Sequence, residues 1–147
     1  MNRVKALPHV YTIDAHSGPE GSVRLTTAGV PELSSAAPAE FGGPGDQWSP
    51  EALLLAALAD CFSLSFRASA RASSLEWSEL SCKANGTLDR VDGRLCFTRI
   101  DLVARLVLAP GQRADRAERL LRKAETGCPI SASLATEIHL DLSIEES

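Results

Sequence analysis

One stretch of the sequence leaves no face for water, and it reads Ser49-Pro50-Glu51-Ala52-Leu53-Leu54-Leu55-Ala56-Ala57-Leu58-Ala59-Asp60-Cys61-Phe62. Ser49 is a suitable N-cap residue, and Pro50 suits the first helical position, where the backbone N–H is unpaired in any case. Every residue from 52 to 59 is apolar, which is typical of a helix surrounded by other protein. Charged residues interrupt the run from Asp60 onward, well short of the roughly 20 apolar residues of a membrane span. We therefore expect a long buried central helix that ends near residue 74.

Alternation of apolar and polar residues predicts strands on both sides of this helix, at 9–15, 22–27, 30–34, 75–90, 94–109 and 137–144. A second helix is expected over 113–126, with the pairs Asp115/Arg119 and Glu118/Arg122 on its exposed side. This order predicts an α+β fold in which antiparallel sheet is wrapped around the central helix. The length of 147 residues suits a single domain, 1–147, with a real core.

The hairpin between the two long strands presents a register problem. A two-residue turn at Asp92-Gly93 would place the apolar residues of the two strands on opposite faces, whereas a three-residue loop at 91–93 places them on one face. We therefore expect the three-residue loop, with Cys96 opposite Leu88. A Cys82–Cys96 disulfide is then excluded, because the two positions lie on the order of 20 Å apart.

Composition excludes some classes of function. The net charge is −4, and the chain has no basic run, so a nucleic-acid partner is not expected. Residues 1–5 are followed by Pro8 rather than by the apolar stretch of a secretory signal, which favours a cytoplasmic protein with reduced thiols. Because the chain has no Cys-x-x-Cys or His-x-x-x-His pair, we expect no metal site. We also expect no bound cofactor.

Cys128 lies between Gly127, which can close one helix, and Pro129, which can open another. At an N-cap, the backbone N–H groups and the helix dipole are expected to lower the pKa of the Cys128 thiol. Cys82 and Cys96 are interpreted as inward-facing strand residues without a chemical role.

Two motifs, Pro50-Glu51 followed by Cys61 and the later Cys128-Pro129-Ile130-Ser131, resemble the organic hydroperoxide resistance (Ohr) and osmotically inducible (OsmC) family of bacterial thiol peroxidases. Peroxide reduction also suits a pair of cysteines without a metal. In that reaction Cys61 attacks the O–O bond, becomes a sulfenic acid, and is resolved by Cys128 to a disulfide. The resemblance implies organic hydroperoxides as substrates, a lipoyl-type dithiol as external reductant, and an intertwined homodimer with a site at each interface.

In the hydroperoxide branch of the family, an arginine in the first hairpin turn activates the thiolate, and a glutamate holds that arginine. Glu51 matches the glutamate, but Pro19 stands where the arginine belongs. Arg24 is our first candidate for the activating arginine, and Arg67 and Arg71 are the next candidates. Each of these arginines could instead be an ordinary surface residue, and Glu51 an ordinary acid in the first turn of a helix.

Three other interpretations stay open. Cys61 could be a structural core residue, because free cysteines are often buried. A Cys-His hydrolase would need His9, His16 or His139 next to Cys61. A non-enzymatic OsmC-like protein could bind a ligand or sense thiol oxidation. The apolar residues Leu58, Phe62 and Phe66 would suit a fatty hydroperoxide, and they are explained equally well as core.

Overall fold

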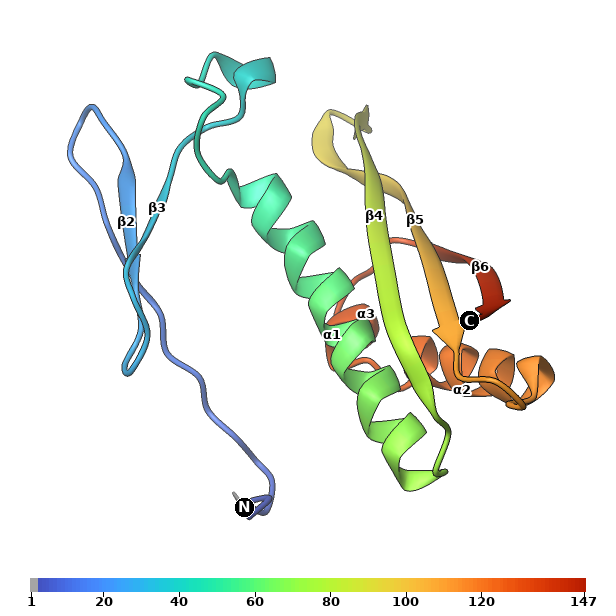
Figure 1. The fold of residues 1–147 in the computed structure, drawn as a ribbon. Coiled ribbons are helices and arrows are strands. Elements are labelled where there is room, and N and C mark those ends of the chain that lie inside the picture. Colours follow the sequence, from blue (N-terminus) through green and yellow to red (C-terminus); the bar gives the residue numbers. More distant parts are fainter. Residues whose placement is uncertain (1–2) are drawn as a thin grey trace. The chain divides into compact units, whose positions relative to one another are not determined.

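The computed structural model describes residues 3–147. The expected absence of a secretory signal also drew on residues 1 and 2, which lie outside the described part. The chain divides into two compact units, residues 1–53 and residues 54–147, and each is described by itself. Helices and strands together give the predicted α+β class (Figure 1).

The first unit is built on a small antiparallel sheet of order β1-β2-β3. Its strands are shorter than predicted, at Asp14–His16, Val23–Thr26 and Leu33–Ser35. The loop between β1 and β2 contains Pro19, as expected. A 3-10 turn at Ala39–Phe41, η1, follows the sheet, and the backbone N–H of Ala36 then donates to the carbonyl of Trp48, 2.8 Å away.

The central helix α1 spans Pro50–Ala72 and begins as predicted. Its N-cap is Ser49, whose hydroxyl accepts a 3.1 Å hydrogen bond from the backbone N–H of Ala52. By length and apolar composition α1 could cross a membrane. However, Leu58, Phe62 and Phe66 are fully buried in the hydrophobic core of the second unit. Helix α1 therefore contributes one face to the core, as expected of a core helix. The predicted burial on every side is not found within this chain, because Leu58 is the only buried residue of 52–59.

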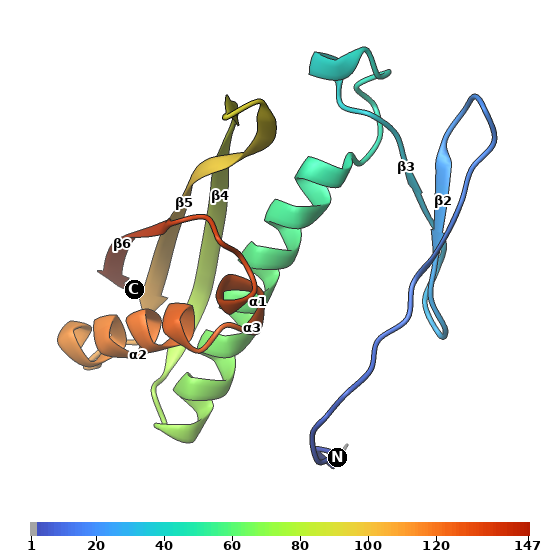
Figure 2. The same ribbon diagram turned by 180° about the vertical axis from the view of Figure 1, so that it is seen from behind.

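The second unit contains a sheet of order β4-β5-β6, formed by Trp77–Val91, Arg94–Leu108 and Ile138–Glu146. Strands β4 and β5 are antiparallel, whereas β6 runs parallel to β5. A parallel neighbour needs a crossover connection, and here it consists of α2 (Ala114–Thr126) and α3 (Pro129–Ala132). Figures 1 and 2 show that this crossover carries the chain past the end of β5 and back to the sheet.

The predicted three-residue hairpin loop is wrong. Val91 pairs with Arg94, so Asp92 and Gly93 form a two-residue turn, and both have positive φ as such turns require. The register conflict is instead resolved by a β-bulge, because Thr87 pairs with Arg99 while Leu88 pairs with Phe97. The bulge turns Cys96 outward, opposite Asp89, and Cys96 is exposed.

The bulge also directs Phe97 to the inner face of the sheet, where its ring lies over Gly86. A Cβ atom on Gly86 would lie 2.7 Å from Cε1 of Phe97 and 3.0 Å from Cδ2 of Leu55, closer than carbon atoms can approach. Gly86 therefore permits contact between the Phe97 ring and α1.

A single hydrophobic core joins the helices of the second unit to one face of β5. Ile100, Leu102, Ala104 and Leu106 alternate along β5 and are fully buried. Helix α2 adds Ala117, Leu121 and Ala124. Its predicted ion pairs Asp115–Arg119 and Glu118–Arg122 are present, with N–O distances of 3.1 Å and 2.8 Å. This core fixes the positions of α1, α2 and α3 relative to one another.

Candidate functional site

Cys61 lies in the middle of α1, half-buried at the edge of the core. It is too far from the start of α1 to benefit from the helix dipole, which acts mainly within the first turn. Any activation of the Cys61 thiol must therefore come from neighbouring side chains.

Cys128 is the N-cap of α3, with Pro129 at the first helical position, as predicted. Its sulfur accepts a hydrogen bond from the backbone N–H of Ser131 over 3.4 Å, and the residue is only 1% exposed. The crossover between β5 and β6 thus carries a buried thiol at a defined position.

The structure brings Cys61 and Cys128 together. The Cys61 side chain lies close enough to Cys128 to raise the pKa of its thiol, and both residues are free cysteines. Helix α3 follows directly on α2, and α2 and α1 pack in one core, so two cysteines 67 positions apart (128 − 61) meet. Adjacent thiols of this kind can alternate between a dithiol and a disulfide.

The predicted lowering of the Cys128 pKa is wrong. Burial raises the pKa of Cys128, and the hydrogen bond and charge of Cys61 raise it further. Backbone N–H groups of Ser131 and Ile130 act in the opposite direction, but they are outweighed. The physical reason is that α3 has only four residues and a weak dipole, whereas desolvation of a buried thiolate is costly. Cys128 is therefore protonated at neutral pH.

Glu51 occupies the first turn of α1, and its Oε2 atom is buried without a hydrogen-bond partner among residues 3–147. Leaving an ionised carboxylate in that condition is costly unless a cation or other donor reaches it. A donor such as an arginine would satisfy this oxygen, and the role of Glu51 in holding one stays a prediction.

Arg24 lies on β2 and forms an ion pair with Glu32, at an N–O distance of 3.3 Å. Both side chains are largely exposed. Arg67 and Arg71 lie on exposed positions of α1. Arg24 and Cys61 belong to different units, so the activating role of Arg24 stays a prediction, as do the catalytic roles of Cys61, Cys128 and Glu51.

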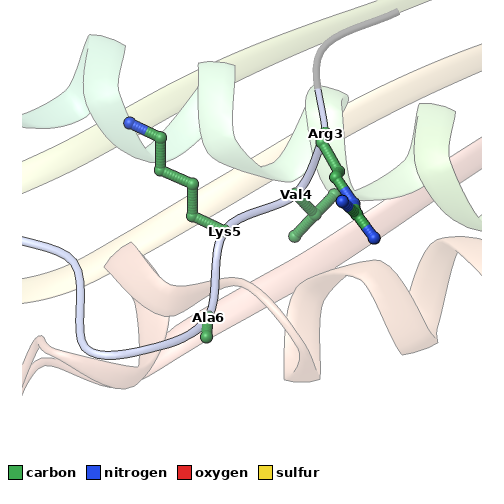
Figure 3. A pocket seen from close by; sticks show the side chains of 4 residues that line it. All are labelled: Arg3, Val4, Lys5 and Ala6. Carbon is green, nitrogen blue, oxygen red and sulfur yellow. The ribbon is translucent and has the colours of Figure 1, made fainter.

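The other predicted candidates have structural roles or simple surface contacts. Leu58, Phe62 and Phe66 are fully buried, which favours the interpretation as core over substrate contact. His139 lies on β6, 3.7 Å from Glu137, and His9 contacts the carbonyl of Lys5. No group of three metal-ligating side chains occurs among the described residues. A hollow lined by Arg3, Val4, Lys5 and Ala6 contains none of the cysteines (Figure 3).

Sequence reasoning missed the contact between Ser131 and Glu125. The hydroxyl of Ser131 donates to Oε1 of Glu125, 2.8 Å away, beside Cys128. The signal was available, because Ser131 is at position N3 of a helix capped by Cys128, and side chains at N3 often take part in capping.

Comparison with known proteins identifies the family. Residues 43–143 match the family model described as OsmC-like protein, which is more than half of the chain. The chain belongs to the OsmC family. The resemblance found in the sequence is thereby confirmed, and the matched range of the OsmC family includes Glu51, Cys61 and Cys128 but not Arg24.

Relatives within the OsmC family support this assignment. Peroxiredoxin OsmC of Escherichia coli (strain K12) is 33% identical over 97 residues, which cover 66% of this chain and 67% of that protein. A solved organic hydroperoxide resistance protein OsmC from Legionella pneumophila is 30% identical with a TM-score of 0.74, covering 96% of this chain and 99% of that chain. An OsmC-like protein of unknown function from Vibrio cholerae, 16% identical, shares the fold with a TM-score of 0.85, covering 92% and 99% of the two chains.

Proposed function

We propose that this OsmC-family protein is a thiol-dependent peroxidase that reduces organic hydroperoxides. The observation that carries the proposal is the contact between the Cys61 and Cys128 thiols. The name of the Escherichia coli relative, a peroxiredoxin, and that of the Legionella pneumophila structure, an organic hydroperoxide resistance protein, support the same class of reaction.

The reaction begins when the Cys61 thiolate attacks the outer oxygen of the hydroperoxide. The O–O bond breaks, Cys61 becomes a sulfenic acid, and the departing alkoxide takes up a proton to give an alcohol. Cys128, which is protonated and adjacent, then attacks the Cys61 sulfur. The S–O bond breaks, the S–S bond forms, and water leaves with the thiol proton. An external dithiol of the lipoyl type restores both thiols by disulfide exchange and is itself oxidised to a cyclic disulfide.

Glu51 and Arg24 complete the proposed site. The buried carboxylate oxygen of Glu51 has no hydrogen-bond partner among the described residues, and an arginine paired with it would supply the positive charge that the proposed Cys61 thiolate needs. Arg24 can exchange its present partner, Glu32, at little cost, since exposed ion pairs contribute only about 0–1 kcal/mol. Pro19, in the loop before β2, has no charge to offer.

We further propose that the protein is an intertwined homodimer. In the described part of the first unit, residues 3–53, no hydrophobic side chain is buried, and Val10 and Tyr11 are 87% and 83% exposed. Only four of the 23 residues of α1 are buried. A second copy would cover these apolar surfaces and bring the two first units to the two sites. Light scattering should give about twice 15.6 kDa, and a monomer at micromolar concentration would contradict the dimer.

A second candidate function is a thiol redox sensor or ligand-binding protein located, like the peroxidase, in the reducing cytoplasm. The observation that favours it is the pairing of Arg24 with Glu32, which leaves no arginine paired with Glu51 among the described residues. A sensor would form the Cys61–Cys128 disulfide slowly and would not turn over.

A stopped-flow assay with cumene hydroperoxide and dihydrolipoamide separates the two functions. The peroxidase should show many turnovers, with cumene hydroperoxide preferred over hydrogen peroxide. A single slow oxidation without turnover would support the sensor and contradict the peroxidase.

A further inference from the structure

Glu125, in the last turn of α2, holds both ends of the segment that carries Cys128. Its backbone carbonyl accepts a hydrogen bond from the N–H of Cys128 over 3.3 Å. Its carboxylate accepts one from the hydroxyl of Ser131 over 2.8 Å, in a partly buried position. The backbone N–H of Ser131 in turn donates to the sulfur of Cys128. One residue therefore connects α2 to the N-cap and to the N3 position of α3.

We propose that Glu125 is a positioning residue that keeps Cys128 against Cys61 by holding Ser131. The inference rests on the proposed two-cysteine function and extends it, because the motif that carries the family resemblance does not include Glu125. Glu125 does not touch the reacting sulfur atoms with its side chain, and it acts through the backbone of Ser131.

Helix α3 needs such an anchor because it is only four residues long. A helix of one turn is not stable by itself, since its nucleation is unfavourable. The residue before Cys128 is Gly127, which gives the backbone more freedom than any other residue at that junction. The bond from a hydroxyl to a carboxylate is charge-assisted and is stronger than a bond between neutral groups.

Resolution of the sulfenic acid is the step that depends on this anchor. Cys128 must attack the Cys61 sulfur along the S–O bond while its proton leaves with water, and a small displacement of the attacking atom slows such a step strongly. The attack of Cys61 on the hydroperoxide does not involve Cys128. Loss of the anchor should therefore slow disulfide formation without slowing the first oxidation.

The experiment that tests this proposal measures the equilibrium constant for forming the Cys61–Cys128 disulfide, in the absence of peroxide. The protein is equilibrated in mixtures of oxidised and reduced dithiothreitol, and the linked peptide is quantified by mass spectrometry. The variants are Glu125→Ala, Glu125→Gln and Ser131→Ala, with Glu118→Ala as matched control, because Glu118 lies on the same helix but pairs only with Arg122 among the described residues. Thermal unfolding of each variant reports any general loss of stability.

We expect Glu125→Ala and Ser131→Ala to lower the equilibrium constant for disulfide formation about tenfold. This is the change expected when one charge-assisted hydrogen bond is lost. Glu125→Gln retains an acceptor oxygen and should stay within about threefold of wild type. Glu118→Ala should leave the constant unchanged. If Glu125→Ala does not fold, Ser131→Ala, which removes one partly buried hydroxyl, provides the test alone.

Two negative results have different meanings. If every variant forms the disulfide with the wild-type constant, the role of Glu125 is contradicted, while the two-cysteine cycle stands. If the wild-type protein forms no linked peptide in any mixture, the proposed function itself is contradicted, and the role of Glu125 with it.

Discussion

Cys61 lies beside Cys128 and raises the pKa of its thiol, so this proximity helps to keep Cys128 protonated. A protonated Cys128 suits the proposed resolving step, in which the thiol proton leaves with water. The influence of Cys61 on Cys128 can be tested directly.

Replacing Cys61 by Ser should lower the pKa of Cys128, because both the hydrogen bond and the charge of Cys61 raise it in the wild-type protein. The pKa of Cys128 should nevertheless stay above the ordinary value of 9.0, since burial remains. The measurement is the pH dependence of Cys128 alkylation in the two proteins, read by mass spectrometry. An unchanged or higher Cys128 pKa in Cys61→Ser would show that the two thiols do not interact.

Cys82 makes stability depend on pH in the alkaline range. Burial raises the pKa of Cys82 to about 11, from 9.0 in the unfolded chain. Between these values the unfolded chain loses its proton while the folded chain keeps it, so the free energy of unfolding falls as the pH rises from about 9 to about 11.

Replacing Cys82 by Ala should therefore make this fall shallower, even if the variant is less stable at pH 7. Urea unfolding at a series of pH values from 7 to 11 measures the effect, with Cys96→Ala as control, because Cys96 is exposed. Parallel pH curves for wild type and Cys82→Ala would contradict the burial of this thiol.

Gly86 should not tolerate a larger residue. Gly86→Ala places a methyl group against the Phe97 ring and Leu55, and overpacking of this kind costs about 1–3 kcal/mol. Urea unfolding measures the loss. Gly18→Ala is the control, because its Cβ would approach nothing closer than a backbone oxygen at 3.8 Å. A fully stable Gly86→Ala protein would contradict the packing of Phe97 that the bulge produces.

The activating role of Arg24 can be separated from its ion pair with Glu32. If Arg24 serves Cys61 and Glu51, Arg24→Ala should slow the reduction of cumene hydroperoxide at least about tenfold, because a thiolate in apolar surroundings needs a positive neighbour. Glu32→Ala removes only the exposed ion pair and should leave the rate at or above the wild-type value. Stopped-flow rates of the first oxidation measure both. Equal loss in the two variants would show that the pair is structural.

Local sequence patterns predicted those parts of the fold that depend on local interactions. Ser49 and Pro50 mark the start of α1, and the pairs on α2 follow from their spacing of four residues. The bulge opposite Thr87 could not be predicted, because alternation along β5 is equally consistent with a longer turn. The turn residues Asp92 and Gly93 did suggest a two-residue hairpin turn. The alternation through Cys96 and Thr98 opposed it, because without a bulge that turn would place the apolar residues of the two strands on opposite faces.

In the site, too, the features set by local sequence were predicted, and those set by contacts between separate elements were not. Cys61 and Cys128 were found from their positions on helices, but the sign of the Cys128 pKa shift depends on burial between elements that are distant in sequence. The sequence showed the N-cap position, which lowers the pKa of a cysteine. It did not show how deeply Cys128 is buried, and burial raises that pKa by more. The contact between Ser131 and Glu125 also depends on the angle between α2 and α3. The spacing of apolar residues along the sequence does not predict that angle.

The central claim is that Cys61 reacts with the hydroperoxide and Cys128 resolves the product. The most direct measurement is mass spectrometry of Cys61 after one equivalent of cumene hydroperoxide, with dimedone present to trap sulfenic acid, in wild type, Cys61→Ser and Cys128→Ser. We predict a Cys61–Cys128 disulfide in wild type, a dimedone adduct on Cys61 in Cys128→Ser, and no consumption of hydroperoxide by Cys61→Ser. Undiminished consumption by Cys61→Ser, or an adduct found on Cys128 instead of Cys61, would contradict the account.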